Sequence, residues 1–177
     1  HNGHLQIALH CLNAFDRFLF IPAAQSPLKQ KTPIASGIHR IKMLKLLIKD
    51  LQNTDICDYE IKNNTTSYTW STIQFLKRNF SPDTLTMVIG ADQLTKLHFW
   101  KDTEKIKENV QILCFNRNGL TSASTLKEYS VKFISDFTVP FSSSQIRHKL
   151  FESDDSLVPE MVPESILKYI KTQHLYH

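Results

Sequence analysis

The chain has 177 residues, 41% of them hydrophobic, which suits one domain with a full core and argues against a long disordered region. Its apolar stretches, of which Phe18 to Ala24 is one of the longest, are too short to cross a membrane. The net charge of +4 is scattered along the chain and forms no single basic stripe, so we expect no nucleic-acid partner. The three cysteines match no zinc spacing and lie in apolar segments, which indicates buried free thiols and a cytoplasmic protein.

Apolar residues follow a helical period in some segments and form short continuous runs in others. The clearest helix is expected where Ile38, Ile41, Leu44, Ile48 and Leu51 recur at helical spacing. In chain order we predict a helix at 5–15, a strand at 17–23, a loop at 25–37, a helix at 38–51, a strand at 56–62, a helix at 68–79, a strand at 85–90, short helices from 92 and at 103–108, strands at 110–115 and 131–137, and helices at 144–152 and 164–173.

Continuous apolar strands that alternate with helices predict an α/β protein with a doubly wound parallel sheet and helices on both faces. No repeat or linker interrupts the pattern, so residues 1–177 are expected to form a single domain that includes the C-terminal helices at 144–177. Sheets of this type bind ligands at the carboxyl ends of their strands. Glycine and polar residues gather at four such ends, 22–29, 90–92, 116–119 and 140–144, which predicts a binding crevice but names no reaction.

The first candidate site is His1-Asn2-Gly3-His4, just ahead of a predicted helix. Free N–H groups and the helix dipole favour an anion there, and a nearby phosphate would favour the charged imidazolium. Glycine permits a close backbone approach. These residues therefore fit a polyphosphate site, although a surface histidine is the simpler alternative for either imidazole.

The second candidate site is Ser142-Ser143-Ser144, with Arg147 one helical turn further along. Serines at a helix start can cap the helix or donate to a phosphate, and a guanidinium binds phosphate well. A capped helix with a solvated arginine explains the same residues, so both interpretations stay open.

The third candidate site lies after the strand at 85–90 and contains Gly90, Asp92 and Trp100. A carboxylate just past a buried strand can accept hydrogen bonds from ribose hydroxyls or base amines, and an indole can stack on a flat heterocycle. Asp92 as a helix cap and Trp100 as ordinary core are the alternatives.

Taken in this order, the three groups resemble a known family. His1-Asn2-Gly3-His4 resembles the His-x-Gly-His signature of the nucleotidyltransferase superfamily, and Phe141 to Arg147 resembles its Ile-Ser-Ser-Thr-x-x-Arg signature. The resemblance covers essentially the whole chain and implies a Rossmann-like nucleotidyltransferase fold. Further elements resemble the pattern of bacterial nicotinate-mononucleotide adenylyltransferases: Ser67-Tyr68-Thr69, Gly90-x-Asp92, Trp100 and the tail from Leu157 to Tyr176.

The resemblance also implies a reaction and its residues. An adenylyl group would pass from ATP to nicotinate mononucleotide, which gives nicotinate adenine dinucleotide and pyrophosphate in NAD biosynthesis. The implied catalytic residues are His1, His4 and Arg147. The implied ATP site also contains Gly3, Gly90, Asp92, Ser142, Ser143 and Ser144. The implied mononucleotide site contains Lys29, Tyr68, Thr69, Trp100 and Lys101, with Trp100 stacked on the pyridine ring.

The sequence departs from the family pattern at two places, in the residues before Lys29 and at the start of the chain. Ser26-Pro27-Leu28 precedes Lys29, where the family usually has Pro-Pro-His. Family members also carry a strand and a glycine-rich run ahead of the histidine motif, whereas this chain starts at the motif. We therefore expect a truncated chain that lacks the first strand and is poorly stable and weakly active by itself.

The implied reaction is in-line attack on the α-phosphorus of ATP, and a phosphate monoester needs no enzyme-bound intermediate for it. Mg²⁺ would arrive with ATP and be held mainly by the triphosphate and waters, without a protein metal site. Transfer to nicotinamide mononucleotide or phosphopantetheine, cytidylyl transfer and a nucleotide-binding sensor without catalysis stay open as alternatives. A homo-oligomeric assembly stays open as well.

Overall fold

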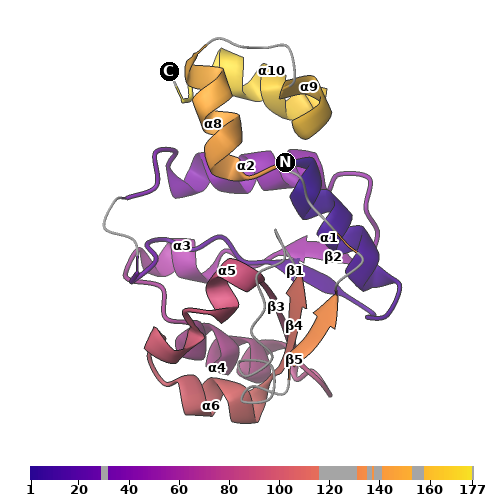
Figure 1. Ribbon diagram of the computed structural model, residues 1–177, viewed down its shortest axis with the longest axis vertical. Helices are drawn as coiled ribbons and strands as arrows, with labels where there is room; N and C mark the ends of the chain where they lie inside the picture. Colours follow the sequence, from indigo (N-terminus) through magenta and orange to yellow (C-terminus); the bar gives the residue numbers. More distant parts are fainter. Residues whose placement is uncertain (29–31, 116–130, 135–136, 138–140, 153–157, 177) are drawn as a thin grey trace. The chain divides into compact units, whose positions relative to one another are not determined.

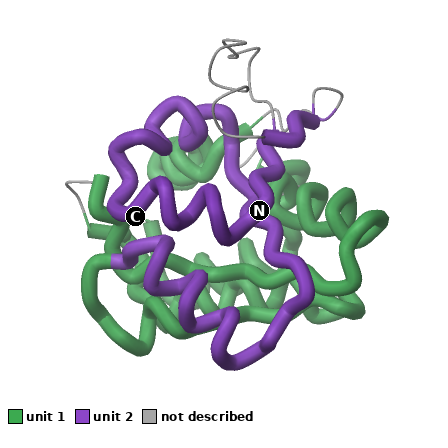
Figure 2. The backbone as a smooth tube through the Cα atoms, turned by 90° about the horizontal axis from the view of Figure 1, so that it is seen from below, with its two compact units in different colours: residues 1–66, 141–177 green, residues 67–140 purple. Residues whose placement is uncertain are grey.

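The computed structural model describes residues 1–28, 32–115, 131–134, 137, 141–152 and 158–176 as helices and strands joined by short loops (Figure 1). The chain divides into two compact units, coloured separately in Figure 2. Unit 1 comprises residues 1–66 and 141–177, and unit 2 comprises residues 67–140. Each unit has its own parallel sheet and its own hydrophobic core.

Unit 1 is built on a two-stranded parallel sheet of β1 (Phe18–Phe20) and β2 (Thr54–Ile56). Phe18 pairs with Thr54 and Phe20 with Ile56. The connection between the two strands contains α2 (Gly37–Leu47). The other described helices of the unit are α1 (Asn2–Leu12), α3 (Tyr59–Asn63), α8 (Ser143–Phe151), α9 (Val158–Met161) and α10 (Glu164–Thr172).

The core of unit 1 joins segments from the beginning and the end of the chain. Helix α10 packs against α2, and the Tyr169 hydroxyl on α10 lies 2.8 Å from Nδ1 of His39 on α2. The buried cluster draws on α2, α8, α9 and α10 and contains Leu47, Ile146, Leu150, Val158, Val162, Ile166 and Ile170.

Unit 2 contains a three-stranded parallel sheet in the order β3 (Thr86–Gly90), β4 (Gln111–Phe115) and β5 (Val131–Ile134). Residues 112–115 of the central strand β4 are all buried, because both faces of a covered parallel strand are packed. The remaining described elements of this unit are α4 (Thr69–Phe80), α5 (Ala91–Leu94), the 3₁₀ helix η1 (Leu97–Phe99) and α6 (Thr103–Asn109).

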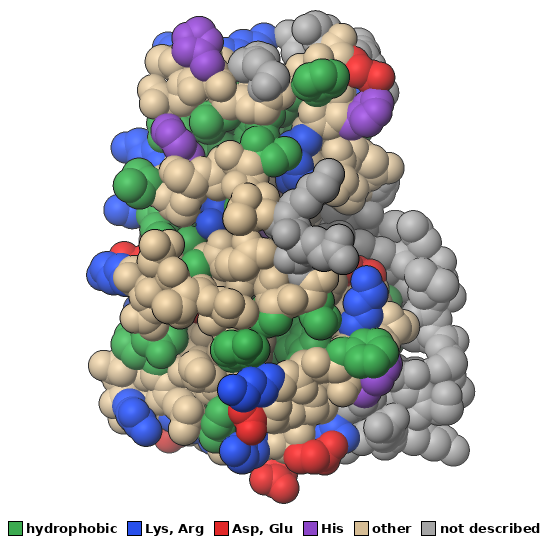
Figure 3. Space-filling model, turned by 90° about the vertical axis from the view of Figure 1, so that its left-hand side faces the viewer, with side chains coloured by type: hydrophobic (Ala, Val, Ile, Leu, Met, Phe, Trp, Pro, Cys, Tyr) green, Lys and Arg blue, Asp and Glu red, His purple; other side chains and the backbone are tan. Residues whose placement is uncertain are grey.

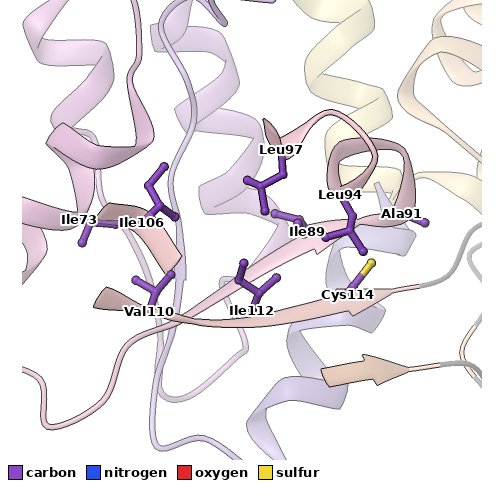
Figure 4. Close-up of a cluster of buried hydrophobic side chains, with 9 residues drawn as sticks. All are labelled: Ile73, Ile89, Ala91, Leu94, Leu97, Ile106, Val110, Ile112 and Cys114. Carbon is purple, nitrogen blue, oxygen red and sulfur yellow. The ribbon is translucent and has the colours of Figure 1, made fainter. Parts of the chain in front are cut away.

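The core of unit 2 forms where the strands meet these helices (Figure 4). Ile89 and Ile112 come from β3 and β4, while Leu97 and Ile106 come from η1 and α6 and are completely buried. Complete burial of two large aliphatic side chains is typical of a tightly packed interior.

The parallel α/β fold predicted from the sequence is confirmed, and so are most of its elements. The strand expected at 56–62 is wrong, because β2 ends at Ile56 and Tyr59–Asn63 is helix α3. Helix signals surround this segment: Asp58 precedes it, Lys62 pairs with Asp58 at 3.0 Å, and Asn64 ends it in the left-handed region with φ 48°. The short helices η1 and α9 were not predicted.

Helices α1 and α2 were both predicted, but α1 starts earlier than expected and α2 buries a different face. Helix α1 begins at Asn2, so the histidine motif belongs to its first turn and does not precede the helix. In α2 the predicted apolar stripe is partly wrong, because Ile38 is 77% exposed and the buried residue is Leu47. Packing against α10 selects a face of α2 that is rotated from the one predicted by apolar spacing alone.

The described Lys and Arg side chains form no single basic stripe on the face shown in Figure 3. Lys and Arg side chains are dispersed over the face drawn in Figure 3. Among the described residues, no helix is both long and apolar enough to span a bilayer.

Candidate functional site

Unit 1 contains a cavity of about 310 Å³ between β1 and helices α2, α8 and α10. Its walls are mainly apolar side chains of these elements, such as Phe20, Met43 and Ile166. Polar groups also line the cavity, and they come from both ends of the chain: His1, His4, Arg40, Ser143, Arg147 and Tyr176. An apolar cavity with a few converging polar groups has the composition expected of a ligand site.

His1 and His4 form a pair at the start of α1. The backbone N–H of His4 donates to Nδ1 of His1 at 3.3 Å, so His1 caps the helix. The two imidazole rings are stacked, with centroids 3.8 Å apart and planes inclined by 13°. Phe141 contacts the His1 ring edge-on with a centroid distance of 5.8 Å. Gly3, which lies between the two histidines in the sequence, is buried. The helix cap and the ring contacts hold both imidazoles at a helix N-terminus, where an anion is favoured.

The three predicted serines have three different positions at the start of α8. Ser142 is the N-cap in a capping box, in which its Oγ accepts from the Gln145 N–H at 3.3 Å and its own N–H donates to Gln145 Oε1 at 2.7 Å. Ser143 lines the cavity. Ser144 is exposed, and its Oγ accepts from Nη2 of Arg147 at 3.1 Å.

Arg147 lies one turn into α8 and lines the same cavity as His1 and His4. The fold therefore brings the two end motifs of the sequence together. Two helix N-termini, that of α1 at His1 and that of α8 at Ser143, border one cavity that also holds a guanidinium. This arrangement can bind a polyanion, because orphan helix N–H groups, helix dipoles and cationic side chains act on the same space.

Sequence reasoning missed two polar residues of the cavity, Arg40 and Tyr176. The Arg40 guanidinium donates from Nε to the Ala35 carbonyl at 3.1 Å and from Nη1 to the Ala23 carbonyl. Burial lowers the pKa of Arg40. A signal was present, because Arg40 is spaced for the same helix face as Leu44 and Leu47, which also line the cavity.

Burial raises the pKa of the Tyr176 phenol, while the positive charges of Arg147 and Arg40 lower it. The phenol thus interacts electrostatically with both arginines at the cavity. The sequence offered a weaker signal here, since Leu175-Tyr176 was part of the family resemblance but no role was attached to either residue.

Gly90 and Asp92 lie where β3 of unit 2 passes into α5. A Cβ atom on Gly90 would stand 2.6 Å from Oδ1 of Asp92, so only glycine lets this carboxylate approach the end of the strand. The Asp92 side chain is exposed and accepts from Nε2 of Gln93 at 2.9 Å. An exposed carboxylate at the carboxyl end of a parallel strand is well placed to accept from hydroxyl groups of a ligand.

The aromatic residues predicted for the mononucleotide also lie in unit 2. Nζ of Lys101 stands 4.8 Å from the centre of the Tyr68 ring, a cation–π contact that joins two of the predicted residues. Thr69 is the first residue of α4. Trp100 is half-buried and packs against the core of unit 2, so part of its indole is structural. Lys29, the predicted strand end at 116–119 and Pro140 of the one at 140–144 lie outside the described residues.

Among the described residues, no group of three or more His, Cys, Asp and Glu side chains is arranged to hold a metal ion. The described polar residues that line the cavity are histidines, arginines, a serine and a tyrosine, without a carboxylate. Mg²⁺ prefers carboxylate and phosphate oxygens, so this set of side chains fits an anion and does not fit a protein-held Mg²⁺.

A parallel α/β fold with two helix N-termini, paired imidazoles and guanidiniums around one cavity is the arrangement expected of a nucleotide-binding protein that holds a phosphate chain. The family model described as cytidylyltransferase-like matches residues 1–149. The chain belongs to this family.

Two curated relatives match over nearly the whole chain. A probable nicotinate-nucleotide adenylyltransferase of Clostridium tetani is 33% identical, and the alignment covers 99% of this chain and 92% of the relative. A probable nicotinate-nucleotide adenylyltransferase of Methylacidiphilum infernorum is 28% identical over 99% of this chain and 86% of the relative.

Solved structures match the fold as well. The nicotinic acid mononucleotide adenylyltransferase of Plasmodium falciparum in complex with NaAD has a TM-score of 0.79 and 19% sequence identity, covering 99% of this chain and 90% of that chain. The same enzyme in complex with APC has a TM-score of 0.78. At this identity the structural match establishes the α/β nucleotidyltransferase-like fold.

Proposed function

We propose that this protein transfers an adenylyl group from ATP to nicotinate mononucleotide, which gives nicotinate adenine dinucleotide and pyrophosphate in NAD biosynthesis. The observation that carries the proposal is the cavity of unit 1, where His1 and His4 from the first motif meet Ser143 and Arg147 from the last. The near full-length similarity to two probable nicotinate-nucleotide adenylyltransferases supports the same reaction.

The reaction is an in-line displacement at the α-phosphorus of ATP. A phosphate oxygen of nicotinate mononucleotide forms the new P–O bond, and the bond to the bridging oxygen of the pyrophosphate breaks, so that pyrophosphate leaves with the bonding electrons. A phosphate monoester is nucleophilic as its dianion, so no residue has to remove a proton first. The contribution of the protein is to position the reactants and to stabilise the charge that develops in the transition state.

In this proposal the catalytic residues are His1, His4 and Arg147, which act on the phosphate chain. Gly3 and the serines at the start of α8 belong to the same ATP site. The position of both imidazoles at the N-terminus of α1 supports this role, because the free N–H groups and the helix dipole favour an anion there. Mg²⁺ enters as the ATP complex, that is, as part of the substrate.

The proposed roles in unit 2 concern the two nucleosides. Gly90 and Asp92 bind the adenosine side, which the exposed Asp92 carboxylate at the end of β3 supports. The nicotinate mononucleotide is bound by Tyr68, Thr69, Trp100 and Lys101 of this unit, together with Lys29 from the first part of the chain. The Lys101–Tyr68 contact, in which a cation covers an aromatic ring, supports a binding surface for a flat anionic group.

The family model spans residues of both units, which supports residues 1–177 as one nucleotidyltransferase domain. Cys11, Cys57 and Cys114 are buried free thiols, which supports a reducing compartment, the cytoplasm, as the place of the reaction.

The experiment that tests the proposal measures pyrophosphate release from MgATP by the full-length protein, with nicotinate mononucleotide and nicotinamide mononucleotide in parallel at equal concentrations. We expect release that depends on the mononucleotide and prefers nicotinate. Release with nicotinamide mononucleotide but not with nicotinate mononucleotide would show that nicotinamide mononucleotide is the acceptor. Binding of ATP without release for either mononucleotide would contradict the reaction and indicate a nucleotide-binding sensor.

A further inference from the structure

The segment after α10 turns back sharply toward the cavity of unit 1. The turn is a Schellman motif, in which the N–H of Leu175 donates to the Ile170 carbonyl at 3.1 Å and the N–H of His174 to the Lys171 carbonyl at 3.2 Å. His174 occupies the left-handed region with φ 48°, and Tyr176 follows with φ 69°. As a result the Tyr176 side chain reaches the lining of the cavity.

This turn contains two non-glycine residues with positive φ within three positions. Such backbone conformations are disfavoured for L-residues and persist only where the surrounding structure enforces them. Here Leu175 and Tyr176 pack against the hydrophobic core of unit 1, which fixes the conformation. The positive φ of His174 is the left-handed conformation that a Schellman motif places directly after the C-cap, and the turn directs Tyr176 to the cavity lining.

Tyr176 lines the same cavity as Arg40 and Arg147, and the positive charges of both arginines act on its phenol. Arginine side chains can only donate hydrogen bonds, whereas a phenol can both accept and donate. A phenol oxygen that accepts a hydrogen bond from an arginine can still donate its own O–H proton to another acceptor. Arg40 is anchored by the Ala23 and Ala35 carbonyls, so one of the two positive charges has a fixed position.

We infer that Tyr176 is a further binding residue of the anion site, where its hydroxyl donates to a phosphate oxygen of the nucleotide beside Arg40 and Arg147. That the phosphate belongs to ATP or pyrophosphate rests on the proposed function. The recognition itself requires only a phosphate chain in the cavity that His1, His4 and Arg147 share with Tyr176.

The chain offers a matched control in Tyr169 on α10. Its hydroxyl lies 2.8 Å from Nδ1 of His39 on α2, in the same unit, and Tyr169 is not among the residues that line the cavity. Tyr169→Phe therefore removes a phenolic hydroxyl that joins two helices, and Tyr176→Phe removes one that faces the cavity. Both changes keep the aromatic ring and its packing.

The test compares the full-length wild type with Tyr176→Phe and Tyr169→Phe in calorimetric titrations with inorganic pyrophosphate and with MgATP, followed by steady-state kinetics. We expect Tyr176→Phe to weaken pyrophosphate and ATP binding roughly tenfold, because it loses a hydrogen bond to a charged group. The KM for ATP should rise with it, while the KM for nicotinate mononucleotide stays the same. Tyr169→Phe should bind both phosphates like the wild type.

Wild-type binding by Tyr176→Phe would overturn the inference. An equal loss in both variants would overturn it too, because the effect would then come from the packing of unit 1. A different result would contradict the proposed function, namely that the wild type releases no pyrophosphate with either mononucleotide. The pyrophosphate titrations still decide the role of Tyr176 in that case, since they need no turnover.

Discussion

The two units of the molecule use their hydrophobic cores differently. In unit 1 the core residues Ile146, Leu150 and Ile166 also line the cavity, so the interior of the unit opens onto its polar site. In unit 2 the core closes around Leu97 and Ile106, which are completely buried. Among the candidate residues of unit 2, Asp92 and Lys101 are exposed, while Gly90 and Trp100 are half-buried.

The difference separates two kinds of recognition. Charged and polar groups in the half-buried cavity of unit 1 act in a lower dielectric than water, which strengthens their effect on a phosphate chain. Exposed groups in unit 2 act mainly by shape, stacking and hydrogen bonding. We therefore expect substitutions in the cavity of unit 1 to change turnover or the binding of the phosphate chain, and substitutions of the candidate residues of unit 2 to change the affinity for one substrate.

The largest effect is expected for His4→Ala. Loss of one preorganised donor in an active site lowers kcat by about a hundred- to a thousandfold, and we expect this loss with little change in the KM for nicotinate mononucleotide. His10→Ala, near the other end of the same helix α1, is the control and should keep its turnover. Steady-state kinetics of both variants check this, and an unchanged kcat in His4→Ala would remove His4 from the mechanism.

Matched truncations of isoleucine compare the two cores directly. Ile106→Ala creates a new void in a closed interior and should cost about 2–5 kcal/mol of the free energy of unfolding. Ile146→Ala only enlarges an existing cavity and loses fewer packing contacts, so its cost should lie near the lower end of the same range. Urea unfolding of both variants measures the difference. Equal costs would show that the cavity does not weaken packing around Ile146.

On the surface of unit 2, Trp100→Leu tests stacking on the pyridine ring. Stacking of a base on an aromatic side chain is worth about 1–3 kcal/mol, so the KM for nicotinate mononucleotide should rise roughly tenfold while that for ATP stays constant. Trp70→Leu is a matched control, because Trp70 also packs against the core of unit 2. A similar response of both variants would assign Trp100 to the core alone.

The smallest effect is expected for Ser142→Ala. This change removes the cap of α8 and should lower the free energy of unfolding by about 1 kcal/mol. Ser144→Ala, which leaves the capping box in place, should change stability by less. Thermal unfolding of the two variants measures both. A larger loss of stability in Ser144→Ala would contradict the capping role of Ser142.

Short-range signals predicted much of the fold and several site residues. Strand β4 follows from an uninterrupted apolar run, and the start of α8 follows from the serines that cap it. Both depend on neighbours within a few residues, so the sequence contains the whole signal. The segment 59–63 shows the limit of this reasoning, since its apolar residues suggested a strand while the capping residues around it favoured helix α3.

The sequence by itself determined the parallel α/β class, and it identified the two end motifs, His1 to His4 and Phe141 to Arg147, as candidate anion sites. Only the tertiary structure decided that His1 and His4 share a cavity with Arg147, and that Arg40 and Tyr176 join them. These residues come from helices and turns far apart in the chain. They come together only when α2, α8 and α10 pack against one another. Burial of apolar surface on these helices drives that packing, and because the hydrophobic effect is non-directional, local sequence signals do not reveal which helices will meet.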